Sequence, residues 1–290
     1  MGRITVNRPV TRIRLGYEPN RRADALAVEE PLEIRVAGRP LAVTMRTPGH
    51  DVELATGFFV SEGIISSGED VRAAIHCGGP GTGPGGQANT YNVLDVALAP
   101  GVQLPESTLS RNFYTTSSCG VCGKASIDAV RTVSSFQLAE DETRIGAETV
   151  LSFPDQLRAR QDVFEKTGGL HAAALFDAET AEMLVIREDV GRHNAVDKVV
   201  GWAAQQGLLP LRRTVLQVSG RASFELVQKA VMAGIPVLSA VSAPSSLAVE
   251  LAAESGLTLL GFVRGSSMNV YTRPERILVP SLLTPSTVPG

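Results

Sequence analysis

Residues 214–262 have the sequence TVLQVSGRASFELVQKAVMAGIPVLSAVSAPSSLAVELAAESGLTLLGF, in which short apolar runs alternate with amphipathic segments. The apolar runs predict strands at Thr214 to Ser219, Val237 to Ala240 and Thr258 to Phe262, and the segments between them predict helices at Ser223 to Ala233 and Ser245 to Glu254. Strands that alternate with helices need right-handed crossovers, so the pattern favours a largely parallel sheet with helices on both faces.

The same alternation extends upstream to about residue 150. The sequence predicts a helix from about Pro154 to Lys166 capped by Ser152, strands at His171 to Phe176 and Met183 to Glu188, and a helix at Asn194 to Gln206. Together these segments predict a three-layer α/β/α domain over residues 151–276, followed by a tail at 277–290.

The first hundred residues predict strands and one helix. Short alternating runs predict a meander of strands at Asp24 to Val28, Leu32 to Val36 and Leu41 to Met45, a helix at Asp51 to Ser61 that packs on the sheet, and another strand at Tyr91 to Leu98. Residues 78–87 are rich in glycine and proline and are expected to form a mobile loop. We therefore expect an α/β protein with a smaller β-rich N-terminal domain at 1–112 and a connector at 113–150.

Composition restricts the classes of function. The chain has 290 residues, of which 43% are hydrophobic and 20% charged, and its net charge is -3, which is typical of a soluble globular protein. No basic tract is present to bind nucleic acid. Neither an apolar signal core at the N-terminus nor a run of about 18 apolar residues is found, so we expect a cytoplasmic protein that does not bind membranes.

Cys119 and Cys122 stand in the run TTSSCGVCGK at residues 115–124. A Cys-x-x-Cys pair commonly has one thiol of lowered pKa, because the neighbouring S–H, backbone N–H groups and a nearby cation stabilise the thiolate. Sulfur chemistry is the leading hypothesis. A structural zinc site needs four ligands, and only Cys77 and four histidines remain, so a mixed site stays open but no metal is expected. Inert buried thiols are the other alternative, and the flanking glycines favour a loop over a core position.

Polar residues follow four of the predicted strands, at the edge of the sheet where ligands commonly bind in such folds. The four segments are 189–194, 220–223, 242–246 and 264–269. Helix N-termini and arginine side chains bind anions, so these segments predict a nucleotide or phosphate pocket with Arg192, His193, Ser219 and Arg221 among its residues. In the alternative interpretation the serines are only helix caps and the arginines lie in solvent.

Four further side chains allow more than one interpretation. His171 lies in an apolar run, which favours a core imidazole over an acid–base group, whereas His193 lies at a helix start and is better placed to contact a ligand. Glu188 and Asp189 form a carboxylate pair, or else cap the helix and pair with neighbouring arginines.

The order of elements resembles the cytidine-deaminase-like fold, which raises the question of zinc. Zinc deaminases need His-x-Glu at one helix start and Pro-Cys-x-x-Cys at the next. Asn194 and Ala195 follow His193 instead, and the next helix starts at SGRAS with no cysteine. The sequence therefore predicts the scaffold without the zinc reaction.

The assembled motifs resemble the formate dehydrogenase accessory sulfurtransferase family, also called the FdhD family. They are SCGVCG at 118–123, GGLHAA at 168–173, EDVGRHNAVDK at 188–198, SGRASFELVQK at 219–229 and residues 239–250. The resemblance runs from the N-terminal strands to about Arg276, and departs only in the insert at 78–87 and in the tail.

This resemblance implies a sulfur carrier that accepts sulfur from a cysteine desulfurase and delivers it to the bis(molybdopterin guanine dinucleotide) molybdenum cofactor for formate dehydrogenase. By position, Cys119 matches the persulfide-bearing cysteine and Cys122 its partner. The matching cofactor-binding segment is Phe262, Val263, Arg264, Gly265, Ser266 and Ser267. The guanine nucleotide ends of the cofactor are expected in the basic, glycine-rich loops, and the expected assembly is a homodimer.

Two other classes of function remain open at this point. A thiol-disulfide oxidoreductase would use the same cysteines, but at a strand-to-helix junction of a thioredoxin-like unit rather than between two domains. A cofactor-binding chaperone would use the pocket and need no thiol.

Overall fold

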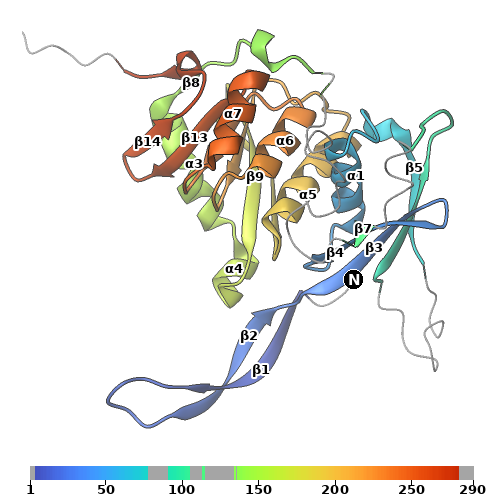
Figure 1. Ribbon diagram of the computed structural model, residues 1–290. Helices are drawn as coiled ribbons and strands as arrows, with labels where there is room; N and C mark the ends of the chain where they lie inside the picture. The colour runs from blue at the N-terminus through green and yellow to red at the C-terminus, as the bar shows by residue number, and fades with distance from the viewer. Residues whose placement is uncertain (1–3, 78–90, 105–112, 115–133, 135, 281–290) are drawn as a thin grey trace, which may run out of the picture.

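The computed structural model describes residues 4–77, 91–104, 113–114, 134 and 136–280. The chain forms a mixed α/β protein in which a C-terminal sheet is covered by helices on both faces and an N-terminal sheet lies beside it (Figure 1). The insert at 78–87 and both Cys119 and Cys122 lie outside the described residues.

The C-terminal sheet has six strands in the order β10-β9-β11-β12-β13-β14. They are β9 (His171–Asp177), β10 (Met183–Asp189), β11 (Thr214–Val218), β12 (Val237–Ala240), β13 (Thr258–Arg264) and β14 (Ser267–Val270). Strands β11, β12 and β13 pair in parallel, whereas β9 pairs antiparallel with both β10 and β11.

The expectation of a largely parallel sheet is therefore wrong at both edges. Residues 178–182 are too short for a crossover, so β9 and β10 form an antiparallel hairpin. Strand β14 was not predicted, because the polar run at 264–269 is typical of a loop; it forms a hairpin with β13 instead.

Helices cover both faces of this sheet in three layers (Figure 1). On one face pack α5 (Arg192–Gln205), α6 (Phe224–Met232) and α7 (Ser246–Ser255), and on the other α3 (Ala147–Ala159). Alternate residues of β9 enter the two cores: Ala173 and Leu175 lie in one, and Ala174 and Phe176 in the other. The three-layer arrangement is as expected from the sequence.

The helix expected at Pro154 to Lys166 is two helices, α3 and α4 (Asp162–Thr167). Pro154 lies inside α3 rather than at its start, and Ser152 is not a cap, since its Oγ donates to the Thr149 carbonyl 2.7 Å away. The apolar spacing of Val150, Phe153 and Leu157 continues the helix across the proline, and all three side chains are fully buried.

The N-terminal sheet has the order β5-β6-β3-β4-β7. Its strands are β3 (Glu30–Val36), β4 (Arg39–Arg46), β5 (Val71–His76), β6 (Val93–Leu98) and β7 (Phe113–Tyr114). The expected three-stranded meander is wrong, because only two of its three strands, β3 and β4, pair within this sheet. Strand β5, which pairs antiparallel with β6, was not predicted. Helix α1 (Asp51–Ser61) has the predicted bounds.

The remaining strand of the expected meander belongs to a separate arm. Strands β1 (Thr5–Arg12) and β2 (Asn20–Ala27) pair antiparallel in a two-stranded ribbon that extends away from the body (Figure 1). We refer to residues 5–27 as the arm. Strand β1 was not predicted, because its three apolar or proline positions, Val6, Pro9 and Val10, are interrupted by polar residues.

Helices α1 and α5 cross at unusually short distance. A Cβ atom added to Gly201 of α5 would lie 1.7 Å from the Glu53 carbonyl oxygen, and one added to Gly57 of α1 would lie 1.9 Å from the Asp197 carbonyl oxygen. The two glycines let the helix backbones touch. Because α1 also packs with Leu32 and Ile34 of β3, a single apolar core joins the N-terminal sheet to α5.

Short elements complete the amino edge of the C-terminal sheet. They are η1 (Gly68–Asp70), η3 (Leu138–Glu140), η4 (Pro274–Arg276), β8 (Ile145–Gly146) and β15 (Ile277–Leu278), of which the last two pair in parallel. Arg276 is fully buried, and its guanidinium donates to the carbonyl oxygens of Gly256 and Asp141 at 2.7 and 2.9 Å. In the part of the chain that the structure describes, no helix is long and apolar enough to cross a membrane.

Candidate functional site

The carboxyl ends of four strands meet at one edge of the C-terminal sheet. Strands β10 and β11 both run opposite to β9, and β12 and β13 run parallel to β11, so all four end at this edge. The segments after β10, β11 and β12 each lead into a helix N-terminus, and the segment after β13 turns into β14. The prediction that the four polar segments meet at one edge is confirmed.

A cavity of about 610 Å³ opens at this edge. Its lining comes from α3, α4, the segment before β9, and the strand ends: Pro154, Asp155, Leu157, Arg158, Gln161, Phe164, Gly168, Gly169, Leu170, His171, Ser219, Val241, Arg264 and Gly265. Among the residues predicted to bind a ligand, Ser219, Arg264 and Gly265 line it. The volume lies in the range of small-molecule and cofactor sites.

Ser219 and His171 form the inner polar wall of the cavity. The Ser219 hydroxyl accepts a hydrogen bond from the Ala172 amide at 2.9 Å, which fixes the end of β11 against the start of β9. His171 is half-buried, and burial lowers its pKa, with Arg192 and His193 acting in the same direction. His171 therefore lies half-buried at the cavity rather than in the core.

Arg264 and Gly265 supply the outer rim. They lie at the turn between β13 and β14, where Gly265 has φ +56° and the Arg264 guanidinium lies 5.9 Å from the ring centroid of Phe262. Arg264 is exposed, and its charge is free to meet an anion in the cavity. Val263, by contrast, is fully buried in the core, so its side chain cannot contact a ligand there.

The wall formed by α3 and α4 was missed by the sequence analysis. The Arg158 guanidinium lies 4.5 Å from the ring centroid of Phe164, in a cation–π contact across the break between the helices. Glu188 fixes α4 by accepting hydrogen bonds from the amides of Val163 and Phe164 at 3.0 and 2.8 Å. Glu188 thus acts as a helix cap, as one of the two interpretations held, but for α4 rather than α5.

Several predicted site residues lie at the same edge but do not line the cavity: Phe262, Val263, Ser266, Ser267, Arg192, His193 and Arg221. Arg221, Ser266 and Ser267 are exposed. His193 is 6% exposed, and its Nε2 lies 3.4 Å from Ser223 Oγ and 3.7 Å from Glu225 Oε2.

The His193 side chain is buried beside charged groups. Burial lowers the pKa of His193 despite the opposing effect of Glu225, and the hydrogen bond from His193 lowers the pKa of Glu225 to about 2. The Nδ1 atom of His193 and the Nε atom of Arg192 are buried, and neither has a hydrogen-bond partner within the described ranges. His193 thus faces the start of α6 through Nε2 and keeps Nδ1 without a partner among the described residues.

The motif at 188–198 joins the N-terminal sheet to α5. Lys198 Nζ lies 2.7 Å from Asp189 Oδ2, and both side chains are at most 1% exposed. The Thr47 amide donates to the same carboxylate, and the Thr47 carbonyl accepts from Lys198. Asn194 extends the contact by donating to the Met45 carbonyl at 2.7 Å and to Asp189 at 3.0 Å. Asp189 and Lys198 are therefore structural residues that position α5 beneath the end of β4.

The cysteine pair follows strand β7 in the sequence. Strand β7 pairs in parallel with β4 and so runs in the same direction. The end of β4 lies near Thr47 and Asn194. Cys119 comes five residues after Tyr114. Within the described part of the chain, no group of three or more His, Cys, Asp and Glu residues could hold a metal ion. The mixed site that would join Cys77 and His76 to the cysteine pair involves residues outside the described part of the chain, and it stays untested.

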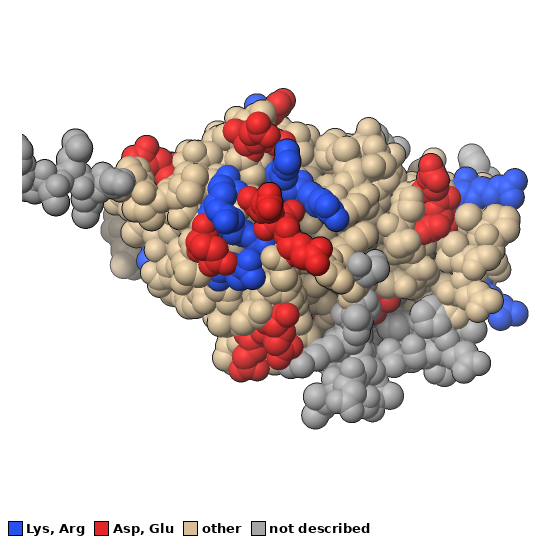
Figure 2. Space-filling model, turned by 90° about the horizontal axis from the view of Figure 1, so that it is seen from above, with Lys and Arg blue, Asp and Glu red and all other residues tan. Residues whose placement is uncertain are grey.

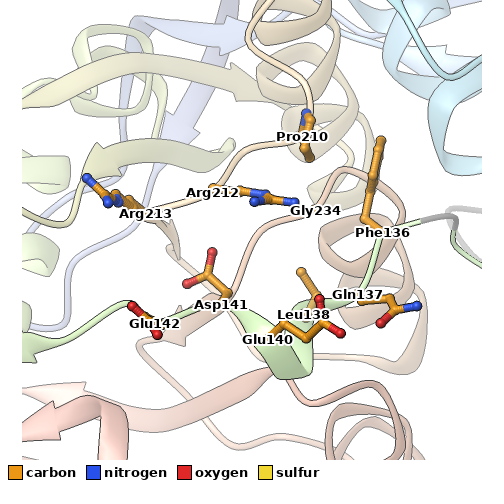
Figure 3. Close-up of a pocket in the computed structure, with 10 residues that line it drawn as sticks. All are labelled: Phe136, Gln137, Leu138, Glu140, Asp141, Glu142, Pro210, Arg212, Arg213 and Gly234. Atoms are coloured by element: carbon orange, nitrogen blue, oxygen red, sulfur yellow. The ribbon is translucent and has the colours of Figure 1, made fainter.

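A second cavity of about 250 Å³ lies at the opposite, amino edge of the sheet. Arg212 and Arg213 lie across it from Glu140, Asp141 and Glu142 (Figure 3). Figure 2 looks onto this side of the molecule and shows acidic and basic side chains interspersed, with no continuous surface of one sign. The cavity at the carboxyl edge is the better candidate ligand site, because the carboxyl ends of the strands and the N-termini of helices meet there.

These features define an α/β protein with a ligand cavity at the carboxyl edge of a mixed sheet, and known proteins share that plan. The model of the FdhD/NarQ family matches residues 27–278. Sulfur carrier protein FdhD of Streptomyces avermitilis is 63% identical over 280 residues, covering 96% of this chain and 97% of that protein. Its counterpart in Mycobacterium tuberculosis is 59% identical over 277 residues, covering 96% and 100%. The chain belongs to the FdhD/NarQ family.

A solved structure has the same fold. The crystal structure of a protein from Desulfotalea psychrophila, described as a formate dehydrogenase accessory protein, superposes with a TM-score of 0.72 and 23% identity, covering 95% of this chain and all of that one. The α/β fold class is thereby confirmed, whereas the resemblance to the cytidine-deaminase-like fold stays a prediction.

Proposed function

We propose that this protein is a sulfur carrier that takes sulfur from a cysteine desulfurase onto Cys119 and passes it to the bis(molybdopterin guanine dinucleotide) molybdenum cofactor of formate dehydrogenase. The observation that carries the proposal is the near full-length identity of about 60% to proteins named sulfur carrier protein FdhD. The cavity at the carboxyl edge of the sheet, which Ser219, Arg264 and Gly265 help to line, supports it as a site for the cofactor.

The chemistry needs both cysteines. The Cys119 thiolate attacks the terminal sulfur of the donor's persulfide, so that a new S–S bond forms on Cys119 and the donor cysteine leaves as a thiolate. In the delivery step, Cys122 attacks Cys119, the terminal sulfur leaves as sulfide for the metal centre, and a disulfide remains for a cellular thiol to reduce. The protein thus acts as a sulfurtransferase.

The cavity is proposed to hold one guanine nucleotide end of the cofactor. Arg264 at the rim suits the diphosphate, and the Arg158–Phe164 pair offers a flat surface to a purine ring. Arg192, His193 and Arg221 at the same edge are proposed to serve the remainder of this large substrate rather than the cavity itself.

Cys119 is expected to gain one sulfur on incubation with a cysteine desulfurase and cysteine. Intact-protein mass spectrometry should show an increase of about 32 Da that dithiothreitol removes, because a persulfide is reducible by thiols. Cys122→Ala should still load but release less sulfide. If Cys119→Ala gains the same mass, the assignment of the carrier residue is wrong; if it gains none yet still supports formate dehydrogenase activity, the protein is a cofactor chaperone.

GDP is expected to bind the cavity, as measured by isothermal titration calorimetry. Arg264→Ala should weaken binding by about 10- to 150-fold, since a hydrogen bond to a charged group contributes roughly 1.5–3 kcal/mol. Arg221→Ala is the matched control, because it removes an exposed arginine at the same edge that does not line the cavity. Equal affinity of the parent and Arg264→Ala would show that the nucleotide binds elsewhere.

A further inference from the structure

The arm is a part of the molecule that the proposed function does not use. It is a two-stranded ribbon in its own sheet, and its main contact with the body is between β2 and α4 (Figure 1). Two-stranded ribbons are marginally stable in water unless a further surface covers them. The far half of the arm, residues 11–23, is exposed throughout. Its side chains are therefore available to another molecule.

The two faces of the arm differ in chemistry. Residues paired across an antiparallel ribbon lie on the same face. The pairs Val6–Leu26, Arg8–Asp24, Val10–Arg22 and Arg12–Asn20 give one face that mixes apolar side chains with three arginines. The pairs Asn7–Ala25, Pro9–Ala23 and Thr11–Arg21 give an opposite face of mostly small, uncharged side chains. Only the first face has the composition of a protein-binding surface.

The turn that joins the strands adds apolar side chains. Ile13, Leu15 and Tyr17 are 74, 94 and 64% exposed, and the Arg14 guanidinium lies 4.5 Å from the ring centroid of Tyr17. Aromatic and aliphatic side chains beside arginine are typical of residues that contribute most to binding. The tip of the arm thus offers an apolar contact surrounded by positive charge.

The charge of the arm indicates the chemistry of its partner. Five arginines and two carboxylates give residues 5–27 a net charge of +3, while the whole chain carries -3, so the remainder carries -6. Two arms repel each other, and Pro9 in the middle of β1 lacks the N–H needed to extend the ribbon into a larger sheet. The arm therefore fits an acidic surface better than a second arm.

The base of the arm lies beside the cavity. A Cβ on Gly169 would lie 3.9 Å from the Cβ of Ala27, the last residue of β2, and Gly169 lines the cavity. A molecule bound to the arm is consequently next to the candidate site. The FdhD/NarQ model starts at the same residue, Ala27, so the arm lies outside the region that the model matches.

We propose that the arm is the docking element for the enzyme that receives the cofactor, and that it binds an acidic patch with an apolar centre on that enzyme. This inference rests on the proposed function for the identity of the enzyme, formate dehydrogenase. Arg8, Arg12 and Arg22 pair with carboxylates of the patch, and Leu15 and Tyr17 fill its apolar centre. The contact holds the enzyme beside the cavity while the cofactor is handed over.

The test is surface plasmon resonance of the full-length protein on immobilised formate dehydrogenase that lacks its cofactor. We expect R8Q/R12Q/R22Q to bind roughly 10- to 100-fold more weakly, with the binding of the parent falling as salt is raised. The control N7E/T11E/A23E changes the net charge by the same three units at exposed positions on the opposite face, and should bind within about threefold of the parent.

The possible contrary results are distinct. Absence of binding by the parent, or equal loss in both triple variants, would overturn the inference. Sedimentation velocity in which the glutamine variant alone loses a dimer would show that the arm binds a second copy instead. If the glutamine variant loses binding to vesicles containing phosphatidylserine but binds the enzyme like the parent, the arm contacts a membrane instead. Sulfur loading on Cys119 and GDP binding should be normal in all variants. If either fails in the parent, the proposed function is rejected, whereas the docking role of the arm is not.

Discussion

A Gly201→Ala chain is expected to lose about 3 kcal/mol or more of unfolding free energy, the upper end of the cost of overpacking. The added methyl group would lie 1.7 Å from the Glu53 carbonyl oxygen and, by the same geometry, 2.8 Å from the Gly57 amide nitrogen. Both are backbone atoms that cannot rotate away, so α1 and α5 must separate and open the core between them. Urea unfolding followed by circular dichroism measures the loss.

Gly169→Ala is the control for that experiment. The nearest atoms to its added Cβ are 3.9 Å away, and its φ is not in the left-handed region. Replacing glycine by alanine at such a position should leave stability unchanged or raise it by up to about 1 kcal/mol. If both variants unfold at the parent's urea concentration, the helices can shift apart at little cost and the short crossing does not determine stability.

Lys198→Met is expected to cost about 3 to 5 kcal/mol, because it leaves the Asp189 carboxylate buried without its cation. Asp189 is fully buried, so water cannot replace the missing partner. The double variant Asp189→Asn/Lys198→Met should recover much of this loss, since the asparagine needs no counter-charge. Thermal unfolding of the two variants, compared with the parent, gives the result.

A double variant that is as unstable as Lys198→Met would contradict this account of the ion pair. It would mean that the hydrogen bonds from the amides of Thr47 and Gly191 to the Asp189 carboxylate, at 3.1 and 2.8 Å, contribute more than the charge of Lys198.

The parts of the fold that follow from local pattern could be predicted from the sequence. Strand β12 and helix α1 have the predicted bounds, and α6 differs by one residue at each end, because the apolar run of the strand and the apolar spacing of the helices define them. The common edge of the four strands follows from the same alternation, and with it the positions of Ser219 and Arg264.

What could not be predicted depends on contacts between distant segments. Strand β14 is short and half exposed at a sheet edge, so it has neither a continuous apolar run nor strict alternation. Arg158 reaches Phe164 only because the chain breaks between α3 and α4. Asp189 and Lys198 are charged, and residues of this type are mostly exposed, so the sequence left the role of Asp189 open and did not predict its buried pair with Lys198.

The close crossing of α1 and α5 limits how this chain can be recombined with its relatives. Gly57 belongs to the half that leads to the cysteine pair, and Gly201 to the half that carries the cavity. A hybrid that takes its first half from one family member and its second from another needs a small residue at both places, together with a lysine at 198 that meets the turn after β4. Exchange of the two halves is therefore restricted to parents that share this crossing.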